Sequence, residues 1–138
     1  MKSTLDLVDI VWQKLQAGAL KAAISGDIHK HRRPANSQLE DVVINSLPIS
    51  SQQMQEAIVN VNIHVPNISI AVNGAVDNTQ PDHERLKTLV PLAVADLSDT
   101  WGDDYNFDVQ QQVLIEDREA KDFYINIRLE FFNVNIST

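Results

Sequence analysis

The sequence predicts an α+β domain built on a mainly antiparallel sheet of about five strands, with two helices packed on one face. Two segments carry apolar residues three and four positions apart, which is typical of amphipathic helices. Other segments alternate apolar and polar residues, as strands with one buried face do. Two of these contain the tetrapeptide Asn-Val-Asn-Ile, at residues 60–63 and 133–136. We expect a single domain over residues 1–138, in the order helix, three strands, helix, two strands.

The N-terminal segment predicts the first amphipathic helix. Ser3 or Thr4 can cap its first turn. Gly18 either ends this helix or dents it, and residues 25–26, Ser-Gly, form a firmer stop. The apolar stripe consists of Leu5, Val8, Trp12, Leu15 and Ala19.

Three strands are expected next, over residues 27–33, 41–45 and 57–65. In the third, alternate side chains share the face that packs on the core: Val59, Val61, Ile63 and Val65. The opposite face carries Asn60, Asn62 and His64. Asparagine is depleted in strands, so its recurrence here is informative. An amide-rich face with almost no charge suits contact with another protein or a wide lumen better than a reaction centre.

Residues 66–82 contain many aliphatic side chains for a connection. An alternating fragment at residues 68–72 is followed by Asn73-Gly74, a strong hairpin signal, and then by a brief Ala-Val pair. We interpret this segment as an arm that buries itself on a neighbouring subunit. The candidate oligomer-interface residues are Ile68, Ile70 and Val72 in this arm and Asn133 and Asn135 near the C-terminus.

The second helix is expected to begin near residues 81–82 and to continue for about four turns. Its stripe consists of Leu86, Leu89, Val90, Ala93, Leu97 and Trp101. Pro91 lies within this stripe and is expected to kink or divide the helix. Trp12 and Trp101 both lie on apolar stripes, so we expect them to anchor the core.

Two strands, over residues 106–115 and 122–136, are expected to close the chain as a hairpin with a charged tip at residues 116–121. In the final strand the apolar positions change from odd to even after Phe132. This change of face predicts a β-bulge or a bend at Phe131-Phe132.

The composition limits the classes of function. Of 138 residues, 43% are hydrophobic and 22% are charged, as in ordinary globular proteins. The net charge of -8 opposes phosphate contacts, so tight DNA binding is not expected. The absence of cysteine excludes disulfides, thiolate catalysis and sulfur-ligated metals. Neither a secretion signal nor a run of roughly 18 apolar residues is present, so we expect a cytoplasmic protein without membrane association.

Few residues form a pattern that indicates catalysis. His29 and His31 would share one face of a strand and are the nearest candidates for a metal site. No His-Glu-x-x-His spacing accompanies them, so we prefer an edge that faces solvent or a partner. The carboxylate pairs at residues 40–41, 103–104 and 116–117 are interpreted as acidic surface. A Gly-x-Ser-x-Gly motif is also absent. We therefore expect no enzymatic activity, no catalytic residue and no cofactor.

The order of the elements resembles a known family. Residues 19–28, 40–45, 57–66 and 86–101 supply a helix-to-strand junction, two strands and the helix before the closing strands. In this order they resemble the bacteriophage tail terminator, or tail completion, family. The resemblance implies a small α+β structural protein of a phage or prophage that forms a hexameric ring, caps the tail tube and joins it to the head. The family supplies no catalytic residues.

The resemblance also implies partners and a location. The chain would self-associate, contact tail-tube and neck proteins, and let DNA pass through the ring without specific binding. It would be found in the bacterial host cytoplasm during assembly and then in the virion tail. Two alternatives stay open. The net charge suits an acidic binding module, such as an immunity protein or antitoxin that blocks a basic nuclease. An enzyme or metal site on His29 and His31 is the other.

Overall fold

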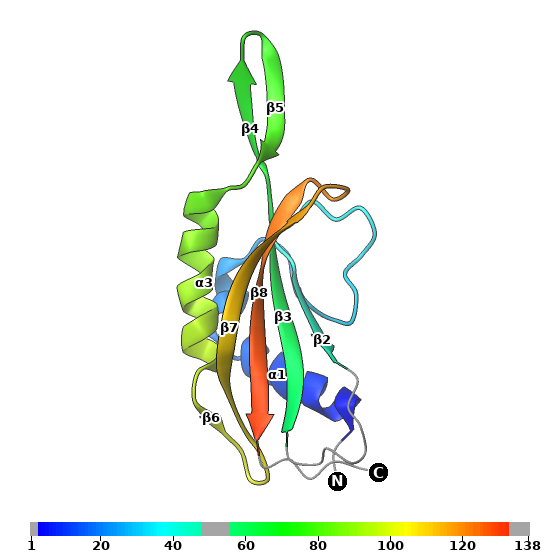
Figure 1. The fold of residues 1–138 in the computed structure, drawn as a ribbon, viewed down its shortest axis with the longest axis vertical. Coiled ribbons are helices and arrows are strands. Elements are labelled where there is room, and N and C mark those ends of the chain that lie inside the picture. Colours follow the sequence, from blue (N-terminus) through cyan, green and yellow to red (C-terminus); the bar gives the residue numbers. More distant parts are fainter. Residues whose placement is uncertain (1–2, 48–55, 133–138) are drawn as a thin grey trace.

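The computed structural model describes residues 3–47 and 56–132. This part of the chain is α+β, with three helices, a mostly antiparallel six-stranded sheet and a separate two-stranded sheet (Figure 1). The elements are α1 (Thr4–Gln16), α2 (Ala19–Ala23), β1 (Ile28–Lys30), β2 (Val42–Ser46), β3 (Glu56–Pro66), β4 (Ile68–Val72), β5 (Ala75–Gln80), α3 (His83–Leu97), β6 (Thr100–Trp101), β7 (Asn106–Asp117) and β8 (Asp122–Phe132). The predicted fold class is confirmed, but one helix and several strands were not expected.

The large sheet has the strand order β1-β2-β3-β8-β7-β6. At its centre, β3 and β8 pair antiparallel along their full lengths, from Glu56 opposite Phe132 to Pro66 opposite Asp122. β1 and β2 pair in parallel, which the sequence did not indicate. A parallel neighbour requires the chain to return to the same end of the sheet, and residues 31–41 make that return.

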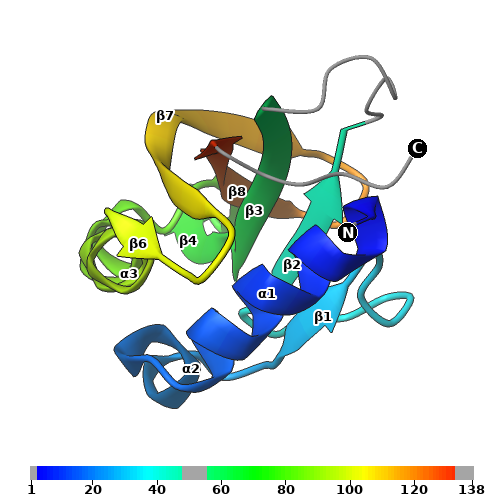
Figure 2. The ribbon, with the colours of Figure 1, turned by 90° about the horizontal axis from the view of Figure 1, so that it is seen from below.

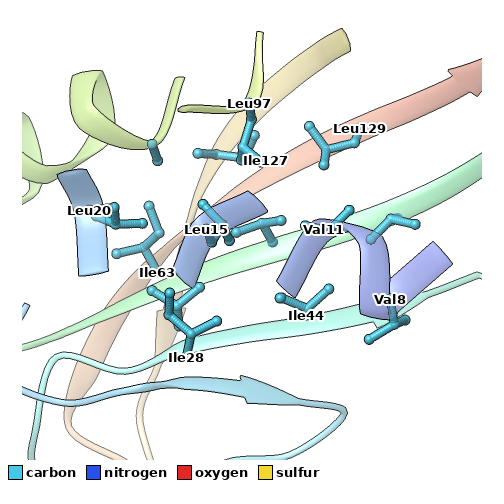
Figure 3. Packing of buried hydrophobic residues seen from close by; sticks show 14 of the residues in the cluster. Val8, Val11, Leu15, Leu20, Ile28, Ile44, Ile63, Leu97, Ile127 and Leu129 are labelled. Atoms are coloured by element: carbon cyan, nitrogen blue, oxygen red, sulfur yellow. The ribbon is translucent and has the colours of Figure 1, made fainter. Parts of the chain in front are cut away.

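The helices lie on the same side of the six-stranded sheet and bury its apolar face (Figure 2). Val59, Val61, Ile63 and Val65 are all buried, which confirms the alternation predicted for this strand. Figure 3 shows Val11 and Leu15 of α1 packed among aliphatic side chains of the sheet such as Ile63. Each fully buried valine or leucine contributes roughly 1.5–3 kcal/mol relative to exposure, so this layer supplies most of the stabilisation.

Local signals set the helix ends. Ser3 and Asp6 form a capping box at the start of α1, and Asp82 accepts a hydrogen bond from the Arg85 amide at the start of α3. Gly18 lies between α1 and α2. A larger residue does not fit at this position, because the Asp96 carboxylate of α3 occupies the space where its Cβ would lie. A Cβ on Gly18 would lie 2.3 Å from Asp96 Oδ2. That carboxylate instead accepts from the first two amides of α2, at 3.2 and 3.1 Å.

The second helix differs from the prediction in part. Pro91 lies inside α3 without dividing it, so of the two predicted effects, a kink or a division, the division does not occur. Pro91 is exposed, so the helical hydrogen bond it cannot make is lost on the solvent side, where water can replace it. Trp101 belongs to β6, is 69% exposed and donates from Nε1 to Asp99 Oδ1 at 2.9 Å. The helix ends at Leu97 and the chain then turns at Asp99, whose φ is 47°, so Trp101 leaves the helical stripe. By contrast, Trp12 is half-buried against the core, as expected.

The structure has a β-bulge in β7, which was not predicted. For the predicted bulge or bend at Phe131-Phe132, the residues beyond Phe132 that carry the change of face lie outside the described residues. The pairing of β8 with both neighbours is regular at Phe131 and Phe132. The irregularity lies in β7 between Val109 and Gln111, so Gln110 is the extra residue. This bulge turns even-numbered β7 residues such as Leu114 toward the side that Phe107 faces before it.

Candidate functional site

The β4–β5 hairpin projects from one end of the molecule, away from the body (Figure 1). Its two strands pair with each other as a sheet of their own. Asn73 and Gly74 at its tip have φ values of 51° and 80°, which suits the tight turn that the Asn-Gly pair predicts. β5 is longer than the brief Ala-Val pair suggested, because it extends to Gln80.

Exposed aliphatic side chains cover this hairpin. Ile70 is 36% exposed and Val72 is 49% exposed, and Ile68 and Val76 are exposed as well. Ile70 and Val72 lie on one face of the hairpin, and Val76, which pairs with Ala71, lies on the other. Exposed apolar side chains that gather on a projecting element are a feature of surfaces that contact a partner. Three of the predicted interface residues, Ile68, Ile70 and Val72, therefore lie together on one accessible element. The other two, Asn133 and Asn135, lie outside the described residues.

One charge belongs to the hairpin. Asp77 is the single ionisable residue between positions 66 and 81, and it lies directly opposite Ile70. Directly opposed residues share a face, so the carboxylate is on the side that carries Ile70 and Val72. Hydrogen bonds from the Thr79 hydroxyl and amide hold the pKa of Asp77 below its usual value. Asp77 is therefore ionised at neutral pH.

The base of the hairpin is fastened to the body through Asn67. Its backbone N–H donates to the Lys121 backbone carbonyl at 3.1 Å, and its side-chain Nδ2 donates to the Asn78 backbone carbonyl at 2.9 Å. The first bond ties the hairpin to the turn between β7 and β8, and the second ties its two strands together. The arm is therefore positioned at its root while its aliphatic part stays accessible.

A row of side-chain amides lies on the face of the sheet opposite the helices. Asn126 on β8 donates to Asn62 at 2.7 Å and to Asn60 at 3.3 Å, and Asn60 donates to Asn45 on β2 at 3.3 Å. These bonds cross three neighbouring strands. The polar face predicted for the third strand is confirmed, but its amides are largely satisfied by one another.

A buried ionic cluster continues this face toward the hairpin end. Arg33 Nη2 lies 2.6 Å from Asp122 Oδ2, and its Nη1 lies 3.8 Å from Asp41 Oδ2. His64 contacts the same Asp122 oxygen through Nδ1 at 3.2 Å, and its ring packs against Tyr124 at a tilt of 33°. Asp41 and Asp122 are each only 2% exposed. Two buried carboxylates therefore share one arginine, which connects the loop after β1 to β2 and β8.

Hydrogen bonds determine the ionisation of Asp41. Burial alone would raise the pKa of this carboxyl, but hydrogen bonds from Ser37, the Asp27 amide and His29 outweigh it and lower the pKa. Ser37 and His29 each contact Asp41 directly. In a nucleophilic triad the histidine lies between the serine and the acid, and that arrangement is not present in this group. The group therefore stabilises the Asp41 carboxylate without activating Ser37.

The first carboxylate pair was assigned wrongly to the surface, since Glu40 and Asp41 are both buried. Glu40 accepts two hydrogen bonds from Arg85 of α3, at 2.6 and 2.9 Å, and one from the Ser25 amide. The Arg85 guanidinium lowers the pKa of Glu40 despite its burial. This pair joins the start of β2 to α3.

The two histidines proposed as a metal pair are separated. His29 lies in β1 beside Asp41, whereas His31 lies beyond the strand with a φ of 69° and is exposed. Among the described residues, a different group brings ligand atoms within 4.8 Å of one another: His64, Asp117 and Asp122. Arg33 already contacts Asp122, so a cation would have to compete with the guanidinium. We interpret the cluster as an ionic crosslink.

Comparison of the chain with protein-family models and with curated proteins finds no match. In the described ranges, no helix has the length and apolar content needed to span a membrane.

Proposed function

We propose that the protein is a structural subunit that self-associates into a ring through its β4–β5 hairpin, as a tail terminator of a phage or prophage would. One observation carries the proposal: the hairpin projects from the body and exposes Ile68, Ile70, Val72 and Val76. Such an arm is costly in a lone monomer, because exposed aliphatic strands promote association. A fixed partner site removes that cost.

In a ring the contact is heterologous: the arm of one copy meets a different surface on the next copy, which passes its own arm on to a third. Heterologous contacts close into a ring with cyclic symmetry when the rotation between neighbouring copies divides a full turn. The net charge of -8 per subunit disfavours adhesion of DNA to the ring wall. An acidic ring is therefore compatible with a conduit at the junction of head and tail.

The test combines the purified protein with the tail-tube protein encoded in the same genome. We expect negative-stain images to show rings at one end of each tube, and light scattering to show a closed oligomer whose mass is a multiple of 15.5 kDa. A protein that stays monomeric at high concentration and leaves tube ends bare contradicts the proposal. Isolation as a one-to-one complex with a basic toxin would favour the acidic binding module instead.

A further inference from the structure

An apolar groove of about 260 Å³ lies between α3 and the inner side of β7 and β8. It is lined by His83, Leu86, Lys87, Val90, Leu114 and Ile125. Leu114 lies opposite Ile125 on the face that the helices cover, yet it remains 48% exposed. α3 therefore leaves this end of the apolar face open.

The groove runs beside an unpaired strand edge. β7 pairs with β8 on one side along its length, but on its other side β6 pairs only with Asn106 and Phe107. Within the described ranges, no strand pairs with that side of β7 between residues 108 and 117. Beyond the bulge at Gln110, residues 111–115 contain neither a charge nor a proline, two of the features that normally protect such an edge. This edge can accept a further strand.

The hairpin of the same copy cannot fill this groove. It is joined to α3 through Pro81 and Asp82 alone, and it points in the opposite direction from the helix (Figure 1). A second copy can present its hairpin to this surface. Its aliphatic face would meet the aliphatic lining, and its single charge, Asp77, has the sign opposite to Lys87 at the groove rim.

We propose that the groove between α3 and β7 is the receiving site for the β4–β5 hairpin of a second copy of this chain. The hairpin extends the large sheet at the β7 edge, inserts Ile70 and Val72 beside Leu114, and places Asp77 next to Lys87. This inference rests on the proposed function, because it names the partner surface of the same contact. Repeated head to tail, this contact is heterologous, as a ring requires, whereas a reciprocal exchange of hairpins would stop at a dimer.

Cysteine crosslinking tests the geometry, since the natural chain contains no cysteine. In the Val72→Cys, Leu114→Cys double variant, brief oxidation of the assembled protein is expected to give a ladder of covalent oligomers. The matched control is Val72→Cys, Arg32→Cys, in which the second cysteine lies exposed beyond β1 at the opposite sheet edge. Each single variant is expected to give dimers at most. Equal ladders in the two double variants would overturn the receiving site.

Charge exchange tests the pairing of Asp77 with Lys87. Asp77→Lys and Lys87→Glu are each expected to raise the protein concentration at half-assembly about tenfold. The double exchange is expected to bring this concentration most of the way back to the wild-type value, because an interfacial charge pair is complementary in either orientation. Glu119→Lys, on the exposed β7–β8 turn, controls for net charge. If the charge variants assemble like wild type and the two double-cysteine variants crosslink equally, this receiving site is overturned while the proposed ring stands. A wild-type chain that never assembles, alone or with tail tubes, overturns both.

Discussion

Arg33 and Asp122 form a buried ion pair across 89 positions of sequence, with Nη2 and Oδ2 2.6 Å apart. The arginine comes from the loop that connects the parallel strands β1 and β2, and the aspartate is the first residue of β8. The pair therefore holds that long loop against the polar face of the sheet. It also lies close to the root of the hairpin, since Asn67 contacts Lys121 next to Asp122.

Arg33→Met is expected to destabilise the fold by about 3 kcal/mol, because removing one partner of a buried pair leaves its carboxylates without a counter-charge. Arg32→Met is the matched control, because Arg32 is the neighbouring residue and its side chain is exposed. This variant is expected to change the free energy of unfolding by less than about 0.5 kcal/mol. Urea unfolding measures both. Adding Asp122→Asn to Arg33→Met is expected to recover part of the loss. Equal stability of the two single variants would contradict this account.

The Glu40 and Arg85 pair predicts a particular dependence on pH. The pKa of Glu40 is lowered in the folded state, so its stabilising contribution is present above the ordinary glutamate value of about 4.3 and is lost as the pH falls through the lower folded value. Glu40→Gln is expected to cost about 2 kcal/mol at pH 7. The difference from wild type is expected to narrow below pH of about 4.

Unfolding of wild type and Glu40→Gln between pH 7 and pH 3, at equal ionic strength, measures this difference. Glu119→Gln, at an exposed position, is the control and is expected to follow wild type throughout. A cost that stays constant across the whole range would mean that the carboxylate charge does not stabilise the contact with Arg85.

The amide row predicts a smaller effect on the sheet. Asn126→Ala removes the donor to both Asn60 and Asn62, so a loss of about 1 kcal/mol is expected. Gln111→Ala on the exposed face of β7 controls for the lower strand propensity of alanine. If the two variants unfold at the same urea concentration, the amide bonds contribute nothing measurable to stability.

Periodic burial explains which parts of the fold the sequence predicted. The alternation over residues 57–65 predicts a strand with one buried face, and Val59, Val61 and Ile63 are buried in the structure. The Asn-Gly pair reports a hairpin turn, and residues 73–74 adopt it. The second strand of that hairpin is longer than predicted, since Asp77 is a poor strand former yet pairs with Ile70 of β4.

Contacts between distant residues explain what the sequence could not predict. No local pattern joins Arg33 to Asp122 or Glu40 to Arg85, because each pair forms only once the sheet and helices are assembled. The alternation that includes Asn60 and Asn62 predicts that His64 lies on the polar face of its strand, but it does not identify Asp122 as the partner of His64. Trp101 was assigned to a helix because its spacing fitted, whereas the turn at Asp99 ended that helix earlier.

The described fold does not depend on the aliphatic face of the hairpin. β4 and β5 form a sheet separate from the large one, and their side chains lie outside the hydrophobic core cluster. Ile70→Asp with Val72→Asp is therefore expected to leave the thermal unfolding midpoint of the dilute protein within a few degrees of wild type. Loss of folding in this variant would mean that the arm packs on its own body.

The mass of the assembly, measured by sedimentation equilibrium over a wide concentration range and with tail tubes added, tests self-association through the hairpin most directly. For wild type, the account predicts a closed oligomer of 15.5 kDa subunits. For the folded Ile70→Asp, Val72→Asp variant, it predicts a monomer under the same conditions. A wild-type chain that remains monomeric throughout, or a variant that assembles as well as wild type, would contradict the account.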